Sequence, residues 1–312
     1  MQPIRKILIA LDHSSLDHEL VDYAKFFVDI SEVTDVHFIH EVNIKLSSKL
    51  KKDFPDLEKN AIEQRREEIE ELIQKHFNPK RVVTHKLTIT NDDSGIKPFI
   101  NAIKEEGIDM VMVGTKQPKD GGGTFTHRIA RRAQCHVLTV PIGGSEHLKR
   151  TNKYKKLLVP IDFSEHSKQA LERAILMASR IQDPVEIICQ NVFTVPSGYH
   201  YSGKTREEFA ELMKKHAMDT YKQFISKIDT KGIEIKPVFS DDLDEDKTTD
   251  IRGLAKKEKV DGIIIGSRGK TTAALILGSV AEKLVRVENK FPLLIVRKKG
   301  DSEGFLDRIR KL

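Results

Sequence analysis

The sequence predicts an α/β protein built from two tandem, doubly wound domains. The chain repeats itself, because Lys6–Ser14 matches Lys156–Ser164 at a shift of 150 residues. Along each half, apolar runs typical of buried strands alternate with stretches that carry apolar residues at helical spacing. This alternation calls for parallel strands joined by crossover helices. The length of 312 residues agrees with two domains at about 150 residues each.

The expected elements follow one order in both halves. The first helices begin near Ser14, which has capping-box spacing to Asp17, and near Ser164, which is a plausible N-cap. The second strands keep the shift of 150 residues. The second strands are expected at His37–Val42 and Ile187–Val192, and the long charged helices at Asp56–Phe77 and Thr205–Ile228. The third strands are expected at Val82–Ile89 and Ile233–Phe239, and the short helices at Gly95–Glu106 and Asp250–Lys259.

The two halves differ between their fourth and last strands. The fourth strands, Asp109–Gly114 and Asp261–Gly266, are shifted by 152 residues. The last strands, Val137–Val140 and Leu293–Val296, are shifted by 156 residues. The first half therefore lacks four residues (156 minus 152) in this connection.

A glycine pattern occupies the same connection in the second half. Gly266-Ser-Arg-Gly269 is followed by eight residues and then by Gly278-Ser279. An apolar run precedes the pattern and a predicted helix follows it, so free backbone N–H groups can converge there on an anion. Glycines let the backbone approach a ligand closely, and the Ser279 hydroxyl lies at the positive end of the helix. Arg268 and Lys270 add positive charge, so we expect the loop to hold phosphate groups.

This pattern is similar to the ATP-binding motif of universal stress proteins. The spacer, Lys270–Leu277, is one residue shorter than the spacer of that motif. The segment that ends in Asp162 and Ser164, and the closing strand Pro292–Val296, also resemble the family. The resemblance covers nearly the whole chain in two copies. It implies that each domain has a five-stranded parallel sheet of strand order 3-2-1-4-5 with helices on both faces.

The resemblance also implies roles for single residues. Asp162 would contact the ribose or base side of a nucleotide, main-chain groups near Val192 would meet the adenine edge, and Pro160 would shape the pocket. The phosphate groups would be held by Gly266, Gly269, Gly278 and Ser279. ATP is the expected ligand, with ADP or AMP as alternatives and with or without Mg. The structural alternative for Asp162 is a helix cap, and for Gly278-Ser279 it is an ordinary capped helix start.

The first half departs from the binding pattern. Gly114-Thr-Lys-Gln-Pro118 lacks the second glycine, and Gly121–Gly123 supplies a flexible turn instead. Asp12 and Val42 are expected to be retained from the pattern. We expect a degenerate pocket, either closed or holding something smaller or different.

Domain boundaries follow from the repeat and from composition. The first domain spans 1–142, and a polar segment with two glycines separates it from the second domain, 153–298. The tail, 299–312, is predicted to be a short amphipathic helix.

Composition disfavours several functional classes. The net charge is +6, but lysines alternate with glutamates along predicted helices, so we expect no nucleic-acid binding. No signal peptide and no run of 18 apolar residues occurs, so we expect a cytoplasmic protein without membrane contact. A P-loop needs glycine five residues before Gly269, where Ile264 stands, and no dinucleotide-binding glycine pattern follows either first strand. The histidines lack metal-ligand spacing.

Taken with the resemblance, these patterns favour a nucleotide-binding, stress-response or regulatory protein that is not a dedicated enzyme. The predicted loop contains no carboxylate before Glu282 to activate water or hold a metal. A slow ATP hydrolase or phosphotransferase is the alternative, and a structural interaction module with a vestigial pocket is the second. The resemblance implies an intramolecular pseudo-dimer that pairs through the last strands, with a homodimer as a further assembly.

Overall fold

The computed structural model of the chain describes residues 2–42, 44, 47–91, 94–116, 124–143, 154–269, 277–288 and 290–297. Contacts divide it into an N-terminal unit, residues 2–152, and a C-terminal unit, residues 153–312. The two units are described separately below. The predicted amphipathic tail lies outside the described residues.

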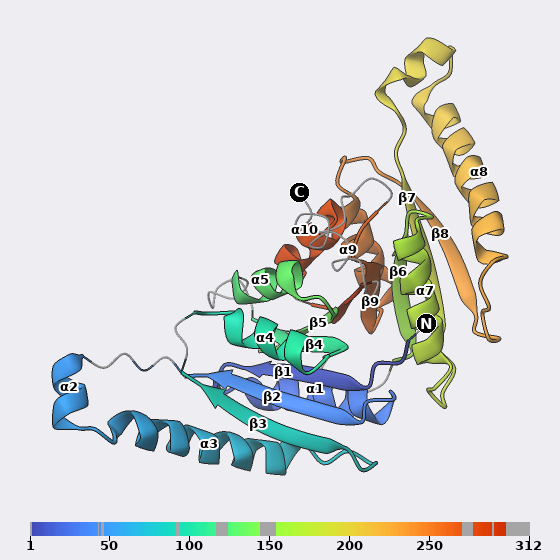
Figure 1. Cartoon of the computed structure of the whole chain (residues 1–312). Coiled ribbons are helices and arrows are strands. Elements are labelled where there is room, and N and C mark those ends of the chain that lie inside the picture. The colour runs from blue at the N-terminus through green and yellow to red at the C-terminus, as the bar shows by residue number, and fades with distance from the viewer. Residues whose placement is uncertain are drawn as a thin grey trace, which may run out of the picture. The chain divides into compact units, whose positions relative to one another are not determined.

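In the N-terminal unit, strands alternate with helices (Figure 1). The elements are, in chain order, β1 (Lys6–Leu11), α1 (Asp17–Asp29), β2 (Asp35–Glu41), α2 (Ser48–Asp53), α3 (Leu57–His76), β3 (Thr84–Thr90), α4 (Lys97–Glu105), β4 (Met110–Thr115), α5 (Thr124–Arg132) and β5 (His136–Pro141).

The C-terminal unit repeats this order with small differences. Its elements are β6 (Lys156–Ile161), α7 (Glu165–Ala178), β7 (Glu186–Phe193), η2 (Ser197–Ser202), α8 (Arg206–Ile225), β8 (Ile235–Asp241), α9 (Lys247–Glu258), β9 (Gly262–Gly266), α10 (Ser279–Val287) and β10 (Leu293–Val296). The short helices α2 and η2 precede the long helices α3 and α8.

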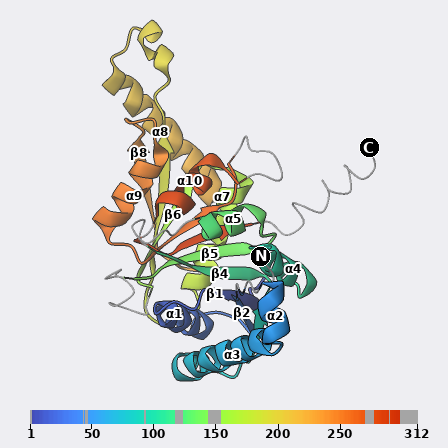
Figure 2. The same ribbon diagram turned by 90° about the vertical axis from the view of Figure 1, so that its left-hand side faces the viewer.

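Each unit is a parallel sheet with one strand order. The N-terminal order is β3-β2-β1-β4-β5, and the C-terminal order, β8-β7-β6-β9-β10, is the same arrangement. Helices α1 and α3 lie side by side (Figures 1 and 2), and α4 contacts α5 through the rings of Phe99 and Phe125. The central strands are buried along nearly their whole length, as parallel strands covered by helices must be. The predicted α/β fold class is confirmed.

An aspartate fixes the first strand beside the fourth in both units. The Asp109 carboxylate accepts hydrogen bonds from the backbone N–H groups of Arg5 (2.9 Å) and Lys6 (3.1 Å). Asp261 does the same for Lys155 (2.7 Å) and Lys156 (2.9 Å). These bonds satisfy N–H groups at the start of β1 and β6 and hold the strand pair in register.

The register of the second strands corrects the sequence alignment. Asp35 pairs with Lys6, whereas Glu186 pairs with Lys156, so the shift between β2 and β7 is 151 residues rather than 150. The residue at the position of Val192 is therefore Glu41, and the expectation that Val42 occupies it was wrong. The sequence pattern alone favoured the shift of 150, which places Val42 opposite Val192, whereas pairing with the neighbouring strand places Glu41 there.

The two first helices begin differently. Ser164 caps α7, since its Oγ accepts a hydrogen bond from the backbone N–H of Ser167, 3.2 Å away. In the N-terminal unit the helix begins at Asp17, and Leu16 at the N-cap position makes no side-chain cap bond. The predicted capping box from Ser14 does not form, because the Asp17 carboxylate instead accepts the backbone N–H of His13.

None of the helices in the described part of the chain combines the length and apolar content that a bilayer crossing requires.

We predict that Gly266→Ala destabilises the protein by about 1–3 kcal/mol, the usual effect of forcing atoms into a filled core. A Cβ there would lie 2.7 Å from the backbone carbon and oxygen of His166, which cannot rotate away. Urea unfolding followed by circular dichroism measures the change.

The matched control is Gly253→Ala on the exposed surface of α9, where an added Cβ meets nothing within 4 Å. This change should stabilise by about 0.5–1 kcal/mol, since alanine restricts the unfolded chain. Equal stabilities for the two variants would contradict close packing of β9 on α7.

Candidate functional site

The C-terminal site begins directly after β6, where the chain turns into α7. Asp162 is half-buried there, and its Oδ1 accepts the backbone N–H of Ser164 at 3.0 Å. This bond orients the carboxylate at the end of the strand. The local role resembles the helix-cap alternative, but Ser164 is the N-cap itself, and Asp162 Oδ2 points to a second segment.

That second segment is the glycine sequence after β9. A Cβ added to Gly269 would lie 2.7 Å from Asp162 Oδ2, so the backbone passes immediately beside the carboxylate. Only glycine fits this path without displacing Asp162.

The two ends of the glycine loop meet. The backbone N–H of Gly278 donates to the carbonyl oxygen of Ser267 at 2.8 Å. A Cβ on Gly278 would lie 3.2 Å from the Cα of Arg268, a tight contact with backbone. The structure therefore brings Asp162, Gly266, Gly269 and Gly278 together. Lys270 lies outside the described residues.

Helix α10 starts at this junction. Gly278 is its N-cap residue, and Ser279, the first helical residue, is exposed. The amide N–H groups of the first turn of a helix have no intrahelical acceptors, and the helix dipole makes this end positive. Together with the half-buried Arg268, this end can attract an anion.

Two further predicted site residues lie on strands. Pro160 is buried in β6 beside Gln190, and Val192 is the next-to-last residue of β7. Asn191, which the sequence reading missed, joins these strands because its Nδ2 donates to the carbonyl oxygen of Ile161 at 2.9 Å. A polar residue inside an apolar strand was the signal that could have identified it.

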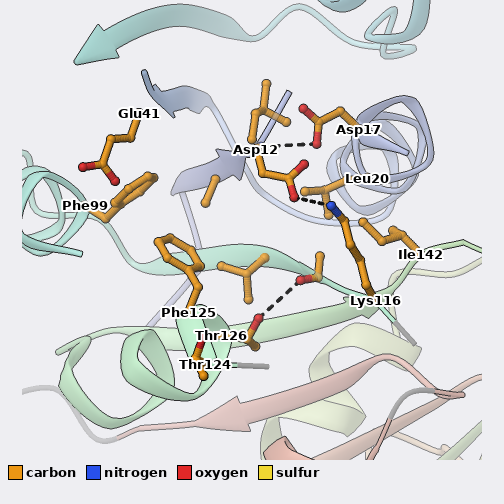
Figure 3. Close-up of a pocket in the computed structure, with 14 residues that line it drawn as sticks. Asp12, Asp17, Leu20, Glu41, Phe99, Lys116, Thr124, Phe125, Thr126 and Ile142 are labelled. Atoms are coloured by element: carbon orange, nitrogen blue, oxygen red, sulfur yellow. Dashed lines mark hydrogen bonds and ion pairs between the residues drawn. The ribbon is translucent and has the colours of Figure 1, made fainter. Parts of the chain in front are cut away.

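The N-terminal unit has a cavity of about 320 Å³ at the corresponding strand ends (Figure 3). Lys116, which directly follows β4, lines it and pairs with Asp12, which directly follows the neighbouring strand β1, at 2.5 Å between Nζ and Oδ2. Burial alone would raise the pKa of Asp12, but the Lys116 contact and hydrogen bonds from Ser14 lower it overall. In the C-terminal unit the corresponding residues are Arg268 and Asp162.

A second carboxylate lies beneath this ion pair. Asp17 is 3% exposed, and its oxygens accept the backbone N–H groups of His13 (2.7 Å) and Asp12 (3.4 Å). Burial and the neighbouring Asp12 carboxylate raise the pKa of Asp17 to about 7. The corresponding residue of the C-terminal unit is Ser167, which is neutral.

The predicted degeneracy of the N-terminal phosphate loop stays a prediction, because residues 117–123 lie outside the described residues. Within the described ranges, His, Cys, Asp and Glu side chains form no group of three or more placed to hold a metal ion.

Comparison with known proteins places both units in one family. A model of the universal stress protein family matches residues 3–141 and 153–297. Universal stress protein MJ0577 of Methanocaldococcus jannaschii is 31% identical over 163 residues, an alignment that spans 97% of that protein and 47% of this chain.

Two solved structures share the fold over almost the whole chain. A universal stress protein from Archaeoglobus fulgidus has a TM-score of 0.60 at 17% identity, with 95% of this chain and 98% of that chain covered. Protein PA1789 of Pseudomonas aeruginosa, described as functionally unknown, has a TM-score of 0.63 at 13% identity, with 99% and 98% covered.

We predict that Asp17→Asn flattens the pH dependence of stability. Since the folded state raises the pKa of Asp17 from 3.8 to about 7, it favours the protonated form. The contribution of Asp17 protonation to the free energy of unfolding is complete below about pH 4. It is lost as the pH rises through about 7, at about 1.4 kcal/mol per pH unit. Urea unfolding at about pH 5 and about pH 8 measures the difference.

Asp53→Asn, which removes an exposed carboxylate from the same unit, is the control and should leave the pH dependence unchanged. If Asp17→Asn and the unaltered protein lose the same stability between the two pH values, Asp17 is ionised throughout and the assignment fails.

Proposed function

The chain belongs to the universal stress protein family, and from this premise we propose that its C-terminal unit binds one adenine nucleotide, most simply ATP. Binding, rather than turnover, would serve a stress-response or regulatory role. The proposal assigns the phosphate groups to the glycine loop and α10, and the ribose or base side to Asp162.

One observation carries the proposal. The Gly278 N–H returns to the Ser267 carbonyl, and Gly269 passes beside Asp162. The beginning of α10 is thereby held at the carboxyl ends of β6 and β9. In an open α/β sheet this is the position at which ligands bind, because the strand order reverses there.

The charges of the described residues support a phosphate group at α10 and a different group at Asp162. Exposed Ser279 offers a hydroxyl donor beside the positive helix end, and Arg268 adds a cation. A carboxylate repels phosphate but accepts hydrogen bonds from ribose hydroxyls or base N–H groups. The nucleotide orientation implied by the family resemblance therefore agrees with the placement of these groups.

The same residues favour binding over catalysis. Hydrolysis of a phosphoanhydride needs a positioned water and usually a metal held by carboxylates. Glu282, the first carboxylate after the loop, lies in the first turn of α10, and its Oε1 accepts a hydrogen bond from Arg286 at 3.1 Å. This hydrogen bond holds the Glu282 side chain against the surface of α10.

We predict that ATP binds with a stoichiometry near one per chain in calorimetric titration. Gly278→Asp should abolish binding, because it puts a carboxylate where the phosphates would lie. Ser279→Ala should weaken binding about tenfold, the typical loss of a hydrogen bond to a charged group.

Gly253→Asp is the matched control, since it adds the same carboxylate to an open position on α9 of the same unit. It should bind ATP as the unaltered protein does. A stoichiometry of two equal sites, or full affinity in the Gly278→Asp and Ser279→Ala variants, would contradict the proposal.

We also propose that the two units form a pseudo-dimer through β5 and β10. Each of these strands ends the order of its own unit, and an apolar edge strand tends to pair with another edge. A separately expressed C-terminal unit should therefore self-associate, which sedimentation analysis would detect. A strictly monomeric unit at high concentration would argue against this pairing.

A further inference from the structure

We propose that His18 and His76 of the N-terminal unit form a binding site for a divalent transition-metal ion such as Zn²⁺, which joins α3 to α1. His18 lies in the first turn of α1, and His76 is the last residue of α3. The site uses none of the residues assigned to the nucleotide, so the proposal does not depend on nucleotide binding.

The fold brings together two histidines that are far apart in the sequence. Helices α1 and α3 lie side by side (Figures 1 and 2), and the ring centres of His18 and His76 are 5.6 Å apart, with planes tilted by 47°. With Zn–N distances of about 2.0–2.1 Å, two imidazoles on one tetrahedral zinc ion have ring centres about 5 Å apart. A small rotation of the two partly exposed side chains reaches that spacing.

The hydrogen bonds of the two rings determine which nitrogen is available to a metal ion. His18 Nδ1 lies 2.7 Å from the carbonyl oxygen of Ser15, and His76 Nδ1 lies 3.1 Å from Asp22 Oδ1. A carbonyl oxygen and an ionised carboxylate only accept hydrogen bonds, so each Nδ1 carries a proton and donates it. In a neutral imidazole this leaves the lone pair on Nε2, a nitrogen that coordinates metal ions.

These hydrogen bonds are of the kind that orients metal-binding histidines. A histidine that ligates a metal donates its other ring N–H to a backbone carbonyl or to a carboxylate, which fixes the ring and strengthens the ligating nitrogen. His18 has the first kind of partner, and His76 has the second. An ion pair with Asp22 by itself would explain the position of His76, but it would not place the His18 ring beside it.

The site is accessible to a hydrated ion. The side chain of His76 is 22% exposed and that of Asp22 is 46% exposed. Within the described ranges, no set of three His, Cys, Asp or Glu side chains is placed to hold a metal ion, so water fills the positions that the two histidines leave open. The Asp22 carboxylate offsets part of the charge of the ion.

The site belongs to only one copy of the repeat. Lys168 stands in α7 at the position of His18, and α8 ends in Ile225 where α3 ends in His76. An ammonium group repels a metal ion, and an isoleucine side chain has no ligand atom. One ion per chain is therefore the expected stoichiometry.

The test titrates the metal-free, full-length protein with Zn²⁺ by calorimetry, in the absence of nucleotide. We expect one tight site per chain and a higher thermal unfolding temperature with Zn²⁺, because the ion binds the folded pair of helices. NMR of the unaltered protein should show that the ring resonances of His18 and His76 shift first. This measurement needs no variant.

Variants test the location. His18→Asn and His76→Asn should each weaken Zn²⁺ binding at least about tenfold, and Asp22→Asn should weaken it about tenfold by removing the carboxylate that orients His76. The controls are His216→Asn, which removes an exposed histidine from α8, and Asp53→Asn, which removes an exposed carboxylate from α2. Both controls should leave the affinity unchanged, and circular dichroism verifies that each variant folds.

Three results would each overturn the proposal. The first is a thermal unfolding temperature of the unaltered protein that Zn²⁺ leaves unchanged. The second is full Zn²⁺ affinity in both His18→Asn and His76→Asn. The third is a set of NMR shifts confined to other histidines.

Discussion

The hydrogen bonds that one aspartate carboxylate in each unit accepts, Asp109 and Asp261, hold the first and fourth strands together, and the sites depend on this pairing. These two strands adjoin in space but are separated by more than 100 residues in sequence. Their carboxyl ends form the place where the strand order reverses, so a ligand can enter between the loops that follow them. A carboxylate that binds two backbone N–H groups at the other end of the pair therefore determines which residues meet at the site.

The two units share this strand pairing, but the chain that follows the fourth strand differs between them. In the C-terminal unit, Gly269 allows the backbone to pass beside Asp162, and the chain returns through the Gly278–Ser267 hydrogen bond. In the N-terminal unit the residue at the position of Gly269 is Gln117, and Lys116 contacts Asp12 instead. A side chain at the glycine position would collide with an aspartate placed as Asp162 is.

The chemistry of each site follows from few residues at the strand ends, while the sheets remain alike. Asp17 takes the position of Ser167 and places a buried carboxyl group in the N-terminal unit. Burial disfavours the ionised form of this group and raises its pKa to about 7. Glu41 takes the position of Val192 and adds a second carboxyl group to the lining of the N-terminal cavity. A duplicated domain can in this way keep its frame while the residues at the strand ends differ.

The sequence by itself determined the α/β class, the repeat and the glycine loop, because apolar periodicity and glycine spacing are local properties of the chain. It also indicated Asp162 and Ser164 through their position after an apolar run. Only the tertiary structure decided that Glu41, and not Val42, corresponds to Val192, since strand register depends on pairing with a neighbouring strand. It likewise decided the Asp17 contacts, the Asn191 bridge and the N-terminal cavity. Each of these features joins groups from different segments of the chain. The burial that strengthens their hydrogen bonds and shifts their pKa values exists only after those segments pack.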